Sequence, residues 1–273
     1  QALAHPAHIK ELADKGLVCM ALDMLPRISR AQSMDVLSSQ SNLSGYAAVI
    51  EAVSRLNKAV PLMMTAAGTI PPAKALILGA GVAGLQAIAT AKRLGAQVYA
   101  FDVRPQVKEQ VESLGAKFIE VSQENFETAD GYASETSLAY QKQQHAAISA
   151  QLATTDIVIT TALIPGKHAP LLITEDMLKQ MPSGGVVVDM ATASGGNVEG
   201  SINDQSIKIG DIEIIGNSTP ARLIPTTASK LFANNIYNFL ATQYHTDSKR
   251  IAFNFKDELV SKICITQNGK LLI

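Results

Sequence analysis

The chain has 273 residues, of which 47% are hydrophobic and 17% charged, and its formal net charge is −1. Its length suffices for one large or two ordinary domains, and its composition is that of an α/β globular protein rather than a disordered one. The near-neutral charge gives no indication of a nucleic-acid-binding surface. The five histidines and two cysteines do not follow the sequence spacing of metal ligands, so no metal site is predicted.

In the first part of the chain, a polar loop lies between segments whose apolar residues predict helices and a strand. Residues 1–16 have a helical pattern, and the apolar run 17–22 predicts a buried strand that contains Cys19. Cys264 lies in a similar run near the end of the sequence, so both cysteines are predicted to be buried thiols. Residues 27–35, RISRAQSMD, predict a polar loop, and residues 43–56 predict a helix with one apolar stripe.

A glycine-rich turn follows at the spacing G-x-G-x-x-G. The apolar run 75–78 predicts a buried strand, and residues 82–94 predict an amphipathic helix. Gly79 permits the tight turn out of the strand, Gly81 lets a pyrophosphate approach the backbone, and Gly84 lets helix and strand pack closely. Ala80 and Val82 complete the turn, and the N–H groups at the start of the helix face the anion. This arrangement predicts a dinucleotide site.

The next strand, residues 97–101, ends at Asp102, 18 residues after Gly84 (102 − 84). At that position a carboxylate can accept hydrogen bonds from the ribose diol of a dinucleotide. Since a 2′-phosphate would meet like charge there, Asp102 favours NAD over NADP. Arg104 weakens this preference slightly, because an arginine can pair with a phosphate.

Beyond Asp102 the pattern alternates between helices and strands that are apolar on both faces. We expect helices at 105–114, 137–152 and after an N-cap at Thr174, strands at 117–121, 156–160, 185–190 and 212–215, and an exposed loop at 122–134. Strands of this kind predict a doubly wound parallel sheet of the α/β class, covered on both sides.

The end of the chain has a different pattern. Residues 229–240 predict a helix, and Asn268-Gly269 predicts the turn of a terminal hairpin. We therefore expect residues 43–226 to form the dinucleotide-binding domain, and residues 1–42 with 227–273 to form a second, incomplete α/β domain. No stretch has the pattern of a signal peptide, a transit peptide or a transmembrane segment.

Three stretches resemble one family. RISRAQSMDVLSSQSNLSGY, GAGVAGLQAIATAKRLGAQVYAFDVRPQVKEQVESLGAKF and TTDIVITTALIPGK are similar to the NAD(H)-binding component of proton-translocating nicotinamide nucleotide transhydrogenase, whose dinucleotide domain is of the Rossmann type. The resemblance implies direct hydride transfer between NAD(H) on this component and NADP(H) on a partner component. A separate membrane component then couples the transfer to proton movement. The resemblance also implies a homodimer, placed peripherally on the cytoplasmic face of the bacterial inner membrane or on the mitochondrial matrix side.

The same resemblance implies roles for individual residues. The loop residues Arg27, Gln32 and Asp35 match contacts to the nicotinamide end and the partner, and are expected to align the hydride transfer, with Ser33 and Met34 beside the cofactor. The remaining expected NAD(H) contacts are Gly79, Ala80, Gly81, Val82 and Gly84 at the pyrophosphate, Asp102, Val103 and Arg104 at the adenosine ribose, and Gly131, Tyr132, Gln144 and Leu163 elsewhere. No general acid or base is expected, because hydride transfer between two nicotinamides requires approach and alignment.

One departure from the family and two alternative functions remain open. The family's component begins with a long segment before the counterpart of Gln1, so we expect this chain to lack part of the first domain. An alanine dehydrogenase-like enzyme has a similar two-domain plan, but it needs a catalytic lysine and histidine in that first domain. A non-catalytic NAD-binding module is the third possibility.

Overall fold

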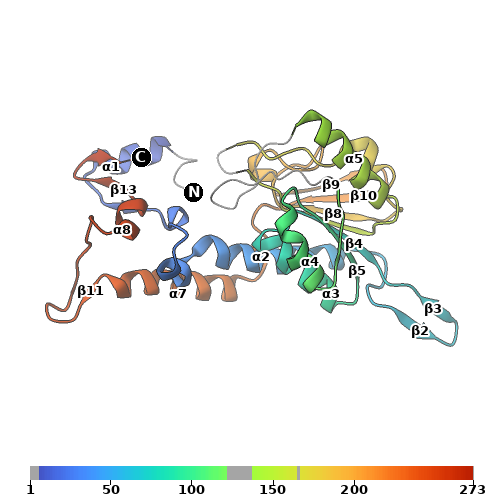
Figure 1. Cartoon of the computed structure of the whole chain (residues 1–273), viewed down its shortest axis with the longest axis horizontal. Coiled ribbons are helices and arrows are strands. Elements are labelled where there is room, and N and C mark those ends of the chain that lie inside the picture. Colours follow the sequence, from blue (N-terminus) through green and yellow to red (C-terminus); the bar gives the residue numbers. More distant parts are fainter. Residues whose placement is uncertain (1–5, 122–136, 165–166, 273) are drawn as a thin grey trace. The chain divides into compact units, whose positions relative to one another are not determined.

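The computed structural model describes residues 6–121, 137–164 and 167–272. The chain divides into two compact units (Figure 1): a smaller unit of Gln1–Gln40 with Pro225–Ile273, and a larger unit of Ser41–Ile224. Within the described ranges, no helix combines the length and the apolar character that crossing a bilayer requires.

The larger unit is built on a seven-stranded sheet. Its spatial order is β6-β5-β4-β7-β8-β10-β9, and the first six of these strands run parallel while β9 pairs antiparallel with β10. The strands are β4 (Lys74–Leu78), β5 (Gln97–Phe101), β6 (Lys117–Phe118), β7 (Ile157–Thr160), β8 (Val186–Asp189), β9 (Gln205–Ile209) and β10 (Ile212–Gly216).

Helices cover both faces of this sheet. One face carries α2 (Val36–Arg55), α3 (Val82–Arg93) and α4 (Lys108–Ser113), and the other carries α5 (Leu138–Leu152) and α6 (Glu175–Leu178). Each face therefore has its own apolar core.

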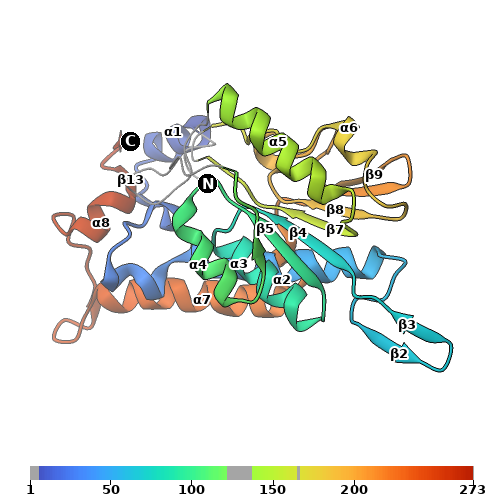
Figure 2. The same cartoon turned by 45° about the vertical axis from the view of Figure 1, so that its right-hand side comes forward.

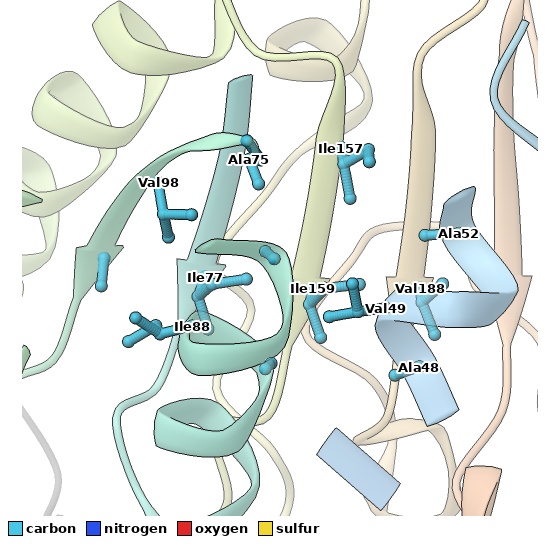
Figure 3. Packing of buried hydrophobic residues seen from close by; sticks show 14 of the residues in the cluster. Ala48, Val49, Ala52, Ala75, Ile77, Ile88, Val98, Ile157, Ile159 and Val188 are labelled. Atoms are coloured by element: carbon cyan, nitrogen blue, oxygen red, sulfur yellow. The ribbon is translucent and has the colours of Figure 1, made fainter. Parts of the chain in front are cut away.

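The first of these cores shows why the central strands are apolar throughout. Ala48, Val49 and Ala52 of α2 pack with Ile77 of β4 and Ile159 of β7 (Figure 3). The strands β7 and β8 are buried at every position, since the opposite side chains of each strand enter the second core. The predicted doubly wound α/β sheet is confirmed.

Three features of the larger unit differ from the prediction. The edge strand β9 was missed, because its sequence QSIKI alternates polar and apolar residues and is largely exposed, unlike the continuous apolar runs that predicted the other strands. The strand predicted at 117–121 is confined to β6. A hairpin of β2 (Met63–Thr65) and β3 (Gly68–Ile70), also unpredicted, projects from the sheet (Figure 2).

The smaller unit combines helices with a three-stranded sheet of order β1-β13-β14. Its elements are α1 (Pro6–Asp14), β1 (Cys19–Met20), the 3₁₀-helices η2 (Leu22–Met24) and η3 (Ser29–Met34), α7 (Pro225–Thr242), the pair β11 (Tyr244–His245) and β12 (Arg250–Ile251), α8 (Glu258–Ile263), β13 (Cys264–Gln267) and β14 (Lys270–Leu271). The predicted terminal hairpin is confirmed, since Asn268 (φ 51°) and Gly269 (φ 73°) turn the chain between β13 and β14.

Four predictions need correction here. The strand at 17–22 shrinks to the two residues of β1, and Leu17 and Val18 are exposed, because β1 is an edge strand whose residues line an apolar groove of about 750 Å³. Cys19 is accordingly only half-buried, whereas Cys264 is buried as predicted. The polar loop at 27–35 contains a regular element, η3, and α2 begins at Val36 instead of residue 43.

Candidate functional site

The strand order reverses at the carboxyl ends of β4 and β7. From β4 the chain passes through α3 to β5 on one side, whereas β7 pairs with β4 on the other side. Such a reversal of strand order is where open α/β sheets bind ligands. Gly79 follows β4 and Thr161 follows β7, so both residues lie at this edge.

The three glycines of the turn have different reasons for lacking a side chain. Gly79 has φ 98°, which disfavours residues with a Cβ atom. A Cβ atom on Gly84 would lie 1.8 Å from the carbonyl oxygen of Gly79, so α3 can pack against the turn only with glycine there. A Cβ atom on Gly81 would meet nothing within 4 Å. Gly81 therefore leaves open space next to the backbone.

Gly81 is also the N-cap of α3 and provides no side-chain acceptor for the first N–H groups of the helix. Those groups carry the positive end of the helix dipole and remain available for an anion. Val82, the first residue of α3, is 42% exposed at the same place. The open space and the donors together fit a pyrophosphate.

Two side chains from neighbouring strands hold the turn in place. Asp102, at the end of β5, accepts a hydrogen bond from the backbone N–H of Ala80 through Oδ2 (2.7 Å). Thr161 donates its hydroxyl to the carbonyl oxygen of Gly79 (3.1 Å). The backbone geometry that an anion would meet is therefore formed before any ligand arrives.

Asp102 is itself bound by Arg104. Its Oδ1 accepts from the backbone N–H and from Nε of Arg104, both at 2.9 Å, and its Oδ2 accepts from Nη2 at 2.9 Å. The two side chains are only 5% and 14% exposed, respectively. Burial costs a carboxylate its hydration, and the hydrogen bonds from Arg104 and Ala80 offset that cost at the end of the strand.

A small cavity of about 50 Å³ adjoins Asp102. Phe118, Val121 and Tyr140 give it apolar walls, and Lys108, which forms an ion pair with Glu120, adds polar groups. Val103 and Pro105 complete the lining. A recess of this size cannot enclose an adenosine, so it marks only the partly apolar surface beside the carboxylate of Asp102.

The other predicted contacts in the larger unit are placed as follows. Gln144 lies on the inward stripe of α5 with Tyr140 and Ile148, and is buried. Leu163 follows β7 and is 47% exposed. The structure thus puts Leu163 at the carboxyl edge of the sheet, close in sequence to Thr161. Gly131 and Tyr132 lie outside the described residues.

Sequence reasoning missed a buried polar cluster at the end of β8. Asp189 is fully buried, and its carboxylate accepts from the hydroxyls of Thr160 (2.9 Å) and Ser201 (2.6 Å) and from the backbone N–H of Asn197 (2.9 Å). The amide of Asn197 accepts from the N–H of Ala162 and donates to its carbonyl oxygen. This network fixes the segment that carries Leu163. In the sequence, this cluster is indicated by an acidic residue at the end of an all-apolar strand.

In the smaller unit, most of the polar groups in residues 27–35 have structural partners. Arg30 forms a forked ion pair with Asp257, which caps α8. The hydrogen bond from Arg30 is the main cause that lowers the pKa of Asp257 below its usual value. The carboxylate of Asp35 accepts from the backbone N–H of Ser38 (2.9 Å) and from its hydroxyl, so it caps the start of α2.

The remaining residues of this segment divide by exposure. Met34 is 3% exposed, and its side chain packs in the core of the smaller unit. The carbonyl oxygen of Ser33 accepts from the side-chain amides of Asn235 and Asn238 on α7 (3.0 and 2.9 Å). Arg27 and Gln32 have exposed side chains.

The chain is similar over nearly its whole length to known proteins. The family model of the alanine dehydrogenase/PNT C-terminal domain matches residues 48–273. A curated NAD(P) transhydrogenase alpha subunit polypeptide of Rhodospirillum rubrum is 48% identical over 99% of this chain and 71% of its own length. The chain belongs to the alanine dehydrogenase/PNT family. Within that family its resemblance to the transhydrogenase component is confirmed.

Two further relatives indicate how the chain is placed in this family. The crystal structure of a transhydrogenase from Sinorhizobium meliloti is 48% identical and superposes with a TM-score of 0.88, covering 99% of this chain and 72% of the other. "Alanine dehydrogenase 2" of Staphylococcus aureus is 30% identical over 69% of this chain and 46% of its own length. The transhydrogenases are therefore the nearer of these two groups.

Proposed function

We propose that this chain is the NAD(H)-binding component of a proton-translocating transhydrogenase, and that its larger unit holds NAD(H). The observation that carries the proposal is the glycine turn fastened to Asp102 at the point where strand order reverses. Open backbone at Gly81 would receive the pyrophosphate, and the adenosine end would lie against the surface next to Asp102. The identity to transhydrogenase subunits favours this member of the family over an alanine dehydrogenase.

In this proposal, the segment 27–35 aligns the hydride transfer. Arg27 and Gln32 have exposed side chains and would contact the nicotinamide end and the partner. Asp35 acts as a positioning residue, because its carboxylate caps α2 and so fixes the end of the segment. The anchors at Arg30 and Ser33 hold the segment to α8 and α7. A rigid segment of this kind contributes to rate by reducing the number of unproductive approaches.

The bound nicotinamide would supply the hydride chemistry, and NADP(H) on a partner component would be the other participant. No residue is assigned as a general acid or base, because hydride passes between the two rings without a proton. The protein's own task is to bind one nucleotide and present its nicotinamide.

We also propose the partner components, the oligomeric state and the location that this function requires. The component would dock against an NADP(H)-binding component and act with a membrane component that couples the transfer to proton movement. It would work as a homodimer, placed peripherally on the inner membrane. The smaller unit, built from both ends of the chain, would form the second domain of the component.

The test combines this chain with the NADP(H)-binding component of a related transhydrogenase. We expect NADPH to reduce an NAD analogue only when both components are present. Gln32→Ala should slow this reaction while NADH still binds, whereas Lys262→Ala, an exposed change in the same unit but outside the segment, should not. Partner-independent reduction would contradict the proposal.

A parallel assay with pyruvate, ammonia and NADH tests the alternative. Oxidation of NADH that requires pyruvate and no partner would assign the chain to the amino-acid dehydrogenases. Binding of NADH without activity in either assay would favour a non-catalytic module.

A further inference from the structure

The carboxylate of Asp102 has no acceptor position to spare. A carboxylate offers about four lone-pair positions. Here Oδ1 accepts from the backbone N–H and Nε of Arg104, and Oδ2 accepts from the N–H of Ala80 and Nη2 of Arg104. A ribose hydroxyl that binds Asp102 must therefore displace one of these donors.

The four donors differ in how easily they can leave. The N–H of Ala80 belongs to the glycine turn, and the N–H of Arg104 belongs to the backbone shortly after β5, so the backbone sets the positions of both. The guanidinium group contributes the other two donors from a flexible side chain. It is the group that a ribose diol would replace.

A displaced guanidinium would remain close to the 2′ position of the ribose. There it could form a charge-assisted pair with a 2′-phosphate, whereas a 2′-hydroxyl offers only a neutral acceptor and a weaker hydrogen bond. Lys108, which lines this cavity, already forms an ion pair with Glu120. Arg104 is thus the cation whose charge would be redirected.

We propose that Arg104 is a specificity-determining residue of the nucleotide site. Its guanidinium competes with the ribose diol for Asp102 and offers a counter-charge to a 2′-phosphate, so the preference for NADH over NADPH is weaker than Asp102 alone would impose. This inference rests on the proposed NAD(H) site and names the residue that sets its selectivity.

The experiment measures NADH and NADPH binding to the chain by itself, with no partner component. In Arg104→Gln we expect the ratio of the NADPH to the NADH dissociation constant to rise about tenfold or more, since one charged hydrogen-bond partner is lost for the phosphate. Asp102→Asn should lower the ratio, because the like charge is gone and Arg104 is released from it. The double variant should lose the NADPH affinity that Asp102→Asn gains.

Two further variants separate charge from geometry. Arg104→Lys keeps the cation but cannot form the fork, so it should retain NADPH binding and bind NADH more tightly. Arg93→Gln removes the same charge from the far end of α3, where its side chain is exposed, and should leave the ratio unchanged. Circular dichroism confirms that each variant is folded.

Equal weakening of NADH and NADPH by Arg104→Gln would overturn the inference, and so would an equal shift in ratio with Arg93→Gln. Because only binding is measured, the outcome is independent of hydride transfer. Intact NADH binding without transhydrogenation would defeat the proposed function alone, whereas a wild-type chain that binds no NADH would defeat both.

Discussion

The glycine turn after β4 and the segment 27–35 use their polar groups in opposite ways. In the turn, side chains from β5 and from the end of β7 hold the backbone, and the N–H groups at Gly81 and the start of α3 are left for a ligand. In the segment, charged side chains are themselves engaged, Arg30 with Asp257 and Asp35 with Ser38.

This difference separates two kinds of site. The turn offers backbone N–H donors in a fixed geometry. Such donors bind an anionic group, and this contact does not depend on the remainder of the ligand. The segment is anchored at Arg30, Ser33 and Asp35 and exposes the side chains of Arg27 and Gln32, which suits orientation of a ligand held elsewhere. Substitutions in the turn should therefore affect binding, and substitutions in the segment should affect rate.

The largest effect is expected for Gly84→Ala. The new Cβ atom would lie 1.8 Å from the backbone oxygen of Gly79, so α3 and the turn must separate. Overpacking of this kind costs about 3 kcal/mol when backbone has to move, which corresponds to a fall of roughly 5–10 °C in Tm. Thermal unfolding and NADH titration measure both losses. An unchanged Tm would show that the backbone of the turn can shift at little cost in stability.

Gly81→Ala is the matched change, three residues earlier in the same turn. Its Cβ atom meets nothing within 4 Å, so we expect Tm to stay within about 1 °C of the wild type. The methyl group would occupy the space through which a pyrophosphate approaches, and the dissociation constant for NADH should rise about tenfold or more. If NADH bound as tightly as to the wild type, the pyrophosphate would have to lie elsewhere.

The sequence predicts contacts between residues that are close in the chain better than contacts between distant residues, and the two regions differ in this respect. The strand, turn and helix from Lys74 to Arg93 depend on neighbouring residues, so glycine spacing and apolar runs predicted them. The fork between Arg104 and Asp102 is also local, but a sequence does not show whether an arginine folds back on its neighbour or extends. The cap at Asp35 and the pair between Arg30 and Asp257 depend on helix starts and on contacts across more than 200 residues.

The cluster around Asp189 illustrates a further limit. Most of its donors are backbone N–H groups of the loop that follows, and only the folded loop brings them together. An acidic residue at the end of an apolar strand indicates that its carboxylate has polar partners at that position. It does not indicate whether the carboxylate faces a ligand or, as here, is fully occupied within the protein.

A smaller effect, on rate, is expected for Gln32→Ala. Its exposed side chain contributes little to packing, so stability should be unchanged. If the segment aligns the nicotinamide, hydride transfer should slow about tenfold while the dissociation constant for NADH changes by less than about threefold. Single-turnover kinetics with the partner component separate the two quantities. A loss confined to affinity would remove Gln32 from the alignment role.

The smallest effect is the pH dependence of the anchor between Arg30 and Asp257. The hydrogen bond from Arg30 lowers the pKa of Asp257 in the folded chain, so the pair stabilises the fold above the ordinary aspartate pKa of about 4 and ceases to do so as pH falls through the lowered value. Arg30→Gln should therefore lower Tm slightly at neutral pH, and the difference from the wild type should disappear in acid. The cap that Asp257 forms on α8 persists in both proteins, so it cancels from the comparison. A Tm difference that stayed constant into acid would mean that Arg30 stabilises the segment through packing of its stem and not through its charge.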